Sequence, residues 1–195
     1  MHMKKFLVLL SLLFVFSNNL FAIEESKIVD VMKDKVDRVI AILQEKEKTK
    51  LEKTDRIFSI MDELFDYKVM SQIALGRDWT NLSDKEKDKF TKLFELKLKN
   101  SYIDKLDLYT NEEIVIDNIK KLNPKRIKLL TYVIGKDDKY EIEYKFYKDG
   151  TSNWLIYDVN IIGVSIMQTY RQQFAEYLKN NSFNNLLVSL NDTSN

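Results

Sequence analysis

A carboxylate and a phenol stand side by side in the last quarter of the chain. Asp158 directly follows Tyr157 within the largely apolar stretch of residues 153–174. An acid beside a phenol can act as a general acid–base pair if the surroundings shift their pKa values. The same Asp158 can instead cap the turn that follows it or pair with a base such as Arg171, while Tyr157 packs. An enzyme is therefore one open interpretation.

Two arginines offer a second kind of chemistry. The planar guanidinium groups of Arg77 and Arg171 could hold a phosphate through parallel hydrogen bonds. Surface salt bridges are the simpler interpretation, because exposed ion pairs are common and weak. Phosphate binding and surface pairing are both open for these residues.

The residues that the chain lacks narrow the possibilities further. There is no cysteine, and the only histidine is His2, so thiolate chemistry, histidine-dependent triads and nearly all zinc sites are disfavoured. The four glycines are scattered and form no phosphate-binding loop. Lys and Arg number 31 against 30 Asp and Glu, which gives no basic excess for nucleic acid. We expect no metal, no cofactor and no nucleic-acid partner.

The first residues have the layout of a secretory signal peptide. Lys4 and Lys5 precede an apolar run at positions 6–16 that only Ser11 interrupts. We predict cleavage after Ala22, which makes residues 1–22 a signal peptide and residues 23–195 a single domain. A membrane span needs roughly 20 apolar residues, so we expect no stable membrane insertion.

Apolar residues at three- and four-residue steps predict helices in the first half of the chain. These helices are expected over residues 24–48, around 57–65, over 67–75 and over 83–109. Gly76 suits a left-handed cap at the end of the third helix. Ser83 and Glu86 have the spacing of a capping box at the start of the fourth, whose wide apolar stripe predicts contacts on two sides.

An alternating pattern then predicts an antiparallel sheet. Four strands are expected, at residues 113–119, 126–134, 140–147 and 154–162. Turn-forming residues separate them, at 123–124, 135–138 and 149–150. The last strand meets Gly163 and is expected to pass at once into a helix that ends near Lys179, before a short final helix. Segregated helices and strands indicate an α+β fold.

The inward faces of these elements are rich in large apolar side chains. Aromatic residues make up 12% of the chain, and most lie on faces that should point inward. One interpretation is a filled core, as in an interaction module. The other is an apolar cavity between helices and sheet that holds a ligand.

Two long blocks of sequence carry a family resemblance. The block at residues 65–90 contains Met70, Ala74, Leu75, Gly76, Trp79, Leu82 and Phe90. The block at residues 153–174 contains Trp154, Tyr157, Asp158, Val159, Gly163, Val164, Ser165, Tyr170, Arg171 and Phe174. Both resemble MlaC-type periplasmic phospholipid-binding proteins, also called the toluene-tolerance family, and the resemblance covers most of residues 23–195. The chain departs from the pattern at Ile162, where the family usually has a glutamate.

This resemblance implies an NTF2-like fold, with helices packed over a curved four-stranded antiparallel sheet. It implies a periplasmic carrier that moves phospholipid between the outer and inner membranes of a Gram-negative envelope, maintaining outer-membrane lipid asymmetry. Its partners would be an outer-membrane lipoprotein complex and an inner-membrane MCE-type ABC transporter, and phospholipid would be its cargo. We expect a monomer. NTF2-like cups also host isomerases and dehydratases, so an enzyme with an Asp/Tyr pair is the alternative.

The cavity of such a carrier would be lined by apolar side chains from helices and sheet, without catalytic or metal-binding residues. Ten residues are predicted to contact the acyl tails: Met70, Ile73, Phe94, Tyr102, Ile142, Tyr144, Phe146, Trp154, Ile156 and Met167.

Overall fold

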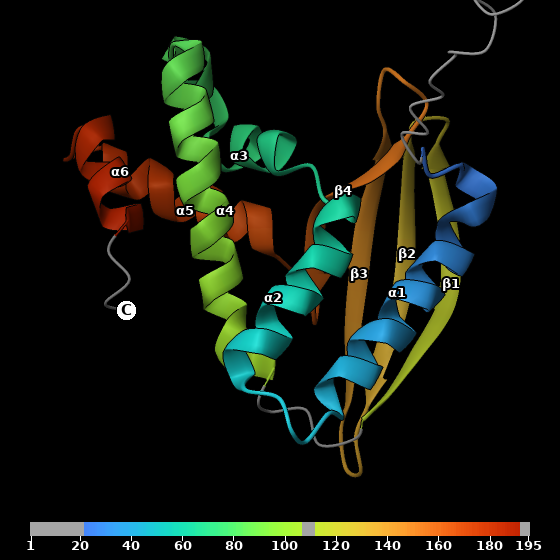
Figure 1. The fold of residues 1–195 in the computed structure, drawn as a ribbon. Helices are drawn as coiled ribbons and strands as arrows, with labels where there is room; N and C mark the ends of the chain where they lie inside the picture. The colour runs from blue at the N-terminus through green and yellow to red at the C-terminus, as the bar shows by residue number, and fades with distance from the viewer. Residues whose placement is uncertain (1–21, 107–111, 192–195) are drawn as a thin grey trace, which may run out of the picture.

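The computed structural model describes residues 22–106 and 112–191, with the side chains of residues 102–106 left aside. The predicted signal peptide therefore lies almost wholly outside the described residues, as does the end of the helix predicted at 83–109. The helices of the first half are α1 (Ile28–Leu43), α2 (Lys50–Met61), α3 (Tyr67–Leu75) and α4 (Asp84–Leu106), and those that close the chain are α5 (Ile166–Leu178) and α6 (Phe183–Asn191). The strands lie between these two groups (Figure 1), so the predicted α+β class is confirmed.

Side-chain caps explain where the helices begin. The predicted capping box at Ser83 is present: its backbone N–H donates to Glu86, and its hydroxyl accepts from the backbone N–H of Glu86. Thr49 and Glu52 form a second capping box that starts α2. The chain therefore leaves α1 at Leu43 rather than near residue 48, because the residues up to Thr49 form the connection between two helices.

Gly76 ends α3 in a different way from the one predicted. Its φ of 59° is positive as expected, but its ψ of −122° lies outside the left-handed helical region. The chain instead continues into the short 3₁₀ helix η3 (Gly76–Asn81). A Cβ at this position would lie 3.1 Å from Nε of Arg171, so any larger residue would push this side chain away in addition to straining φ.

The sheet has five strands rather than the four predicted. They are β1 (Glu113–Asn123), β2 (Arg126–Ile134), β3 (Lys139–Lys148), β4 (Trp154–Ile161) and β5 (Val164–Ser165), all antiparallel and paired in chain order. The additional strand arises because β4 does not pass directly into a helix. Ile162 and Gly163 instead form the centre of a tight hairpin, with φ values of 50° and 77°. Positive φ at both central positions is typical of a two-residue β-hairpin turn.

Replacing Ile162 by glycine is expected to raise the free energy of unfolding by about 1 kcal/mol, because a β-branched residue at positive φ is strained and glycine is not. Little packing is lost, since Ile162 is 61% exposed. In thermal unfolding, the melting temperature should rise by about 2–4 °C. Ile162→Val keeps the strain and should melt like the wild type. A glycine variant that melts at or below the wild-type temperature would contradict this interpretation of the turn.

A bulge sets which residues of β4 face the helices. Lys145 pairs with Asp158 and Phe146 pairs with Ile156, so Tyr157 is an extra residue in β4. Without it, strict alternation would place Asp158 on the same face as Trp154 and Ile156. The bulge instead turns Asp158 to the other face and keeps the following apolar residues on the face of Ile156.

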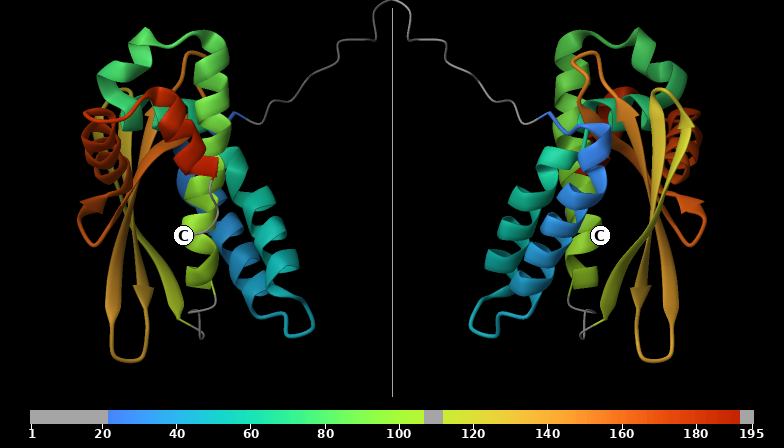
Figure 2. Two further views of the ribbon diagram at one scale, coloured as in Figure 1. Left: turned by 90° about the vertical axis from the view of Figure 1, so that its left-hand side faces the viewer. Right: turned by 90° about the vertical axis from the view of Figure 1, so that its right-hand side faces the viewer.

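The buried apolar residues form two main clusters. The helical core is built from α3, η3, α4, α5 and α6 and includes Phe90, Phe94 and Phe174. The sheet core joins α1 to β2, β3 and β4 and includes Met32, Phe146 and Trp154. Accordingly, α1 crosses the face of the sheet while α3 to α6 gather beyond its β4 edge (Figure 1), and α1, α2 and α4 share one side of the sheet (Figure 2). Among the half-buried described residues, Phe65 and Ile166 pack against both cores.

Candidate functional site

The structure divides nine of the ten predicted tail contacts between the two cores. Met70, Phe94 and Met167 are buried in the helical core, and Ile73 is half-buried against it. The sheet core contains the buried residues Phe146, Trp154 and Ile156, with the half-buried residues Ile142 and Tyr144 packed against it. Tyr102 belongs to α4, but its side chain lies outside the described residues. The nine described residues thus belong to two separate clusters, and contact of all ten with lipid stays a prediction.

Tyr144 packs against the sheet core, yet its side chain stays partly accessible to solvent. It lies on the central strand β3, opposite Leu129 and Val159, and both of these neighbours are buried. Burial raises the pKa of the Tyr144 phenol to about 12. The side chain is nevertheless only half-buried. Ile142 precedes it by two residues on the same strand face and is half-buried in the same way.

The raised pKa predicts a loss of stability at alkaline pH. Below pH 10 the phenol is neutral in both states, whereas between pH 10 and about 12 it ionises in the unfolded chain before it does so in the folded protein. This residue should therefore take about 3 kcal/mol from the free energy of unfolding across that interval. Urea unfolding at a series of pH values measures the loss. Tyr144→Phe should lose less stability over the same interval, and an identical pH dependence in both proteins would contradict the assignment.

Asp158 is fully engaged in structural contacts. It is 4% exposed and accepts hydrogen bonds from Lys145 Nζ at 2.8 Å, Ser165 Oγ at 2.7 Å and the backbone N–H of Met167 at 3.1 Å. The predicted capping role is therefore confirmed, but the base that pairs with Asp158 is Lys145 and not Arg171. The antiparallel register places Lys145 directly opposite Asp158.

Tyr157 packs and does not join Asp158 in an acid–base pair. Its ring lies edge-on to Tyr147, and the guanidinium of Arg126 sits 4.7 Å from its ring centre. No hydrogen bond joins Tyr157 to Asp158 in the part of the chain that the structure describes. Arg171 lies against Gly76, and no hydrogen bond or ion pair between described residues brings it together with Arg77. A phosphate-binding role for the two arginines stays a prediction.

Sequence reasoning missed a charged cluster between the helices. Lys99 Nζ donates to Asp62 and Glu95, each at 2.6 Å, and Tyr67 donates to Asp62 at 2.7 Å. Burial alone would lower the pKa of Lys99, but these hydrogen bonds hold it above its usual value. The cluster ties the end of α2 and the start of α3 to the middle of α4. The only local sequence signal for this cluster was the four-residue spacing of Glu95 and Lys99, which favours an ion pair on one helix.

A second buried lysine holds the same segment from the other side. Lys35 of α1 donates to the backbone carbonyl of Ile60 and to Glu63 Oε2, both at 2.7 Å. Residues 60–63 are thus held by one lysine from α1 and one from α4.

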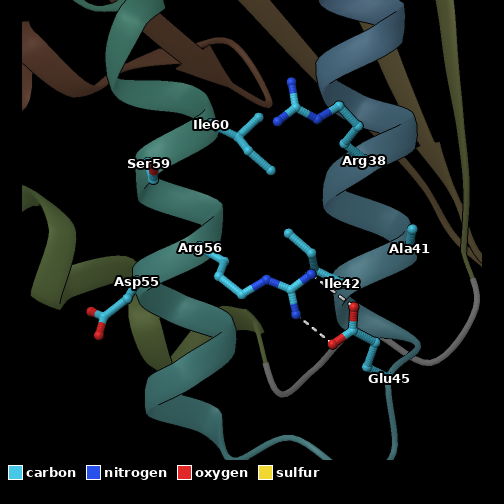
Figure 3. Close-up of a pocket in the computed structure, with 8 residues that line it drawn as sticks. All are labelled: Arg38, Ala41, Ile42, Glu45, Asp55, Arg56, Ser59 and Ile60. Carbon is cyan, nitrogen blue, oxygen red and sulfur yellow. Dashed lines mark hydrogen bonds and ion pairs between the residues drawn. The ribbon is translucent and has the colours of Figure 1, made fainter.

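An open groove lies between α1 and α2 (Figure 3) and has a volume of about 500 Å³. It contains none of the ten predicted tail contacts. Arg56 spans the groove and pairs through both of its terminal nitrogens with Glu45, at 2.5 and 2.9 Å. Its other lining residues are Arg38, Ala41, Ile42, Asp55, Ser59 and Ile60. With four charged side chains and few apolar ones, this groove is a poor match for acyl chains.

The described residues hold neither a metal-binding cluster nor a membrane-spanning helix. No group of three or more His, Cys, Asp or Glu side chains is placed to hold a metal ion among residues 22–106 and 112–191. Within the same ranges, no helix has the length and apolar character that crossing a membrane requires.

Fold and site together define a class of protein. Helices α1, α2 and α4 lie on one side of an open antiparallel sheet, the face toward them carries apolar side chains, and the carboxylate of Asp158 serves the fold. These features define an α+β protein whose helix-facing sheet surface is apolar.

Comparison with known proteins gives the particular family. The MlaC protein family matches residues 33–192, and the chain belongs to this family. A similar solved structure is that of a phospholipid-binding protein from Ralstonia solanacearum in complex with a phospholipid, with a TM-score of 0.72 and 22% sequence identity. The match covers 84% of this chain and 94% of that one. No curated protein matches the sequence.

Proposed function

We propose that this protein is a periplasmic carrier that binds phospholipid and shuttles it between the outer and inner membranes. The observation that carries the proposal is the apolar face of the sheet. On this face Ile142 and Tyr144 are only half-buried, whereas the side chains around them are buried. Membership of the MlaC family supports it, as does the phospholipid bound to the similar protein from Ralstonia solanacearum.

The energetics of lipid transfer fit a surface of this kind. A diacyl lipid has roughly 30 methylene groups, each of which costs about 0.8 kcal/mol in water, so unassisted passage faces a barrier on the order of 20 kcal/mol. A protein that covers the tails removes most of this barrier with apolar area alone. The headgroup can stay in water and needs no charged pocket.

Within this proposal, Ile142 and Tyr144 are the first candidates for tail contact, because they keep accessible area in this structure. Other candidates are buried in the two cores, such as Phe94, Phe146 and Met167. These residues would contact lipid only when the helices shift away from the sheet. Ile73 would line the helical side, and contact of Tyr102 with the tails is part of the same proposal.

The wider setting is also part of the proposal. Residues 1–22 act as a signal peptide, and residues 23–195 work in the periplasm as a monomeric single domain. An outer-membrane lipoprotein complex and an inner-membrane MCE-type ABC transporter exchange lipid with the protein, which maintains the asymmetry of the outer membrane. An acid–base enzyme is disfavoured because the carboxylate of Asp158 is already occupied by Lys145 and Ser165.

Lipid analysis of the native protein tests this function. The full chain is expressed in a Gram-negative host, purified from the periplasm without detergent, extracted with organic solvent and analysed by mass spectrometry. We expect about one phospholipid per protein. A folded periplasmic protein that carries no lipid, and takes none from phospholipid vesicles, would overturn the proposal.

A further inference from the structure

Several polar groups on the helix-facing side of the sheet already form hydrogen bonds or ion pairs within the protein. Thr131 donates its hydroxyl to the carbonyl of Ile142 at 3.1 Å. Lys121 pairs with Glu25 at 2.9 Å, and Lys35 of the facing helix α1 pairs with Glu63. The phenol of Tyr144 differs, because no described residue forms a hydrogen bond with it.

The Tyr144 hydroxyl is also not sealed inside the protein. Among the described residues, the fully enclosed side-chain oxygens without a partner are Thr54 Oγ1, Ser71 Oγ and Asn160 Oδ1. The phenol of Tyr144 is not one of them, so it can meet another molecule. An uncommitted hydroxyl at such depth costs free energy unless water or a ligand satisfies it.

The surroundings of Tyr144 determine which ligand group fits. On the same face its neighbours are Leu129, Phe146 and Val159, and no lysine or arginine lies directly opposite Tyr144 or two residues from it along β3. A phosphate would have to bury its charge here without a cation, which is strongly unfavourable. A neutral carbonyl oxygen accepts one hydrogen bond from the phenol and brings no charge.

We propose that the hydroxyl of Tyr144 donates a hydrogen bond to an ester carbonyl of the bound lipid, so that the protein selects ester-linked over ether-linked glycerolipids. This inference rests on the proposed function as a lipid carrier. The hydrogen bond from Tyr144 gives the apolar face one polar contact. This contact fixes how far the glycerol end of the bound lipid enters between helices and sheet.

Competition between matched lipids tests the selection. The protein is stripped of endogenous lipid and incubated with vesicles that contain equal amounts of dipalmitoyl phosphatidylglycerol and its dihexadecyl ether analogue. Bound lipids are then quantified by mass spectrometry. The wild type should favour the diester by about tenfold, as expected for one net hydrogen bond. Tyr144→Phe keeps the ring, loses the hydroxyl, and should bind both lipids equally. The control Tyr132→Phe, on the opposite face of the sheet, should keep the preference.

The outcomes separate this inference from the function on which it rests. A diester preference that Tyr144→Phe alone abolishes supports the inference. A wild type that binds both lipids equally overturns it whatever the variant does, and so does a preference that survives in folded Tyr144→Phe; in both cases the carrier function stands. If the wild type takes up neither lipid, the carrier function fails as well.

Discussion

Asp158→Ala is expected to lower the free energy of unfolding by about 3–5 kcal/mol, because it leaves the buried end of Lys145 without its counter-charge. The side chain of Lys145 is 18% exposed and that of Asp158 is 5% exposed, so water replaces little of the lost contact. The substitution also removes the acceptor for the hydroxyl of Ser165 and for the N–H of Met167 at the start of α5. Urea unfolding followed by circular dichroism measures the change.

Two further variants test whether the charge on Lys145 causes this loss. Asp158→Asn keeps an acceptor for the cap and should cost less than the alanine variant. Adding Lys145→Met to Asp158→Ala removes the orphaned cation and should recover part of the stability. A double variant as unstable as the sum of the single ones would contradict the ion-pair explanation. If a folded Asp158→Asn protein loses a catalytic turnover that the wild type has, the enzyme interpretation gains over the carrier.

Ile142→Asp is expected to reduce phospholipid retention at least a hundredfold, because an ionised carboxylate would face acyl tails without a cation beside it. Ile142 is half-buried, so the chain can keep its fold where a closed residue such as Phe146 could not. Mass spectrometry of lipid extracted from the purified variant measures retention. Circular dichroism checks that the variant is folded.

The matched control introduces the same charge at an exposed position of the edge strand β1. Leu122 of β1 is 45% exposed, so Leu122→Asp should keep its lipid. Unchanged lipid content in folded Ile142→Asp would remove this part of the sheet from the lipid-binding surface. Equal loss in both variants would point to a general effect of added charge.

Local signals predicted most of the elements. The capping box at Ser83 and the turn at Asn123-Pro124 lie where the sequence placed them, because each depends on residues a few positions apart. The alternation of β3 also held, with Phe146 on the buried face. What the sequence could not show was the pairing of distant residues, such as the Lys145–Asp158 contact and the position of Lys99 beside Asp62.

The missing fifth strand has a clear physical origin. A two-residue strand after Ile162 is too short to leave a periodic signal, so the corner was expected to lead straight into a helix. The bulge at Tyr157 depends on the partner strand and shows in β4 only as a change in the alternation after Ile156. Similarly, periodicity identifies the apolar side of a helix but not the core that it joins. The division of the described tail-contact candidates between two cores was therefore not visible in the sequence.

The division into two cores also has a mechanical consequence. The described chain passes from the sheet core to the helical core at Phe65, just before α3, and again at Ile166, where α5 begins. Rotation of one block against the other would disturb the contacts of these two side chains and hydrogen bonds such as that from the N–H of Met167 to Asp158, while each block keeps its own buried interior. We therefore expect such a rotation to cost less free energy than opening a single continuous core.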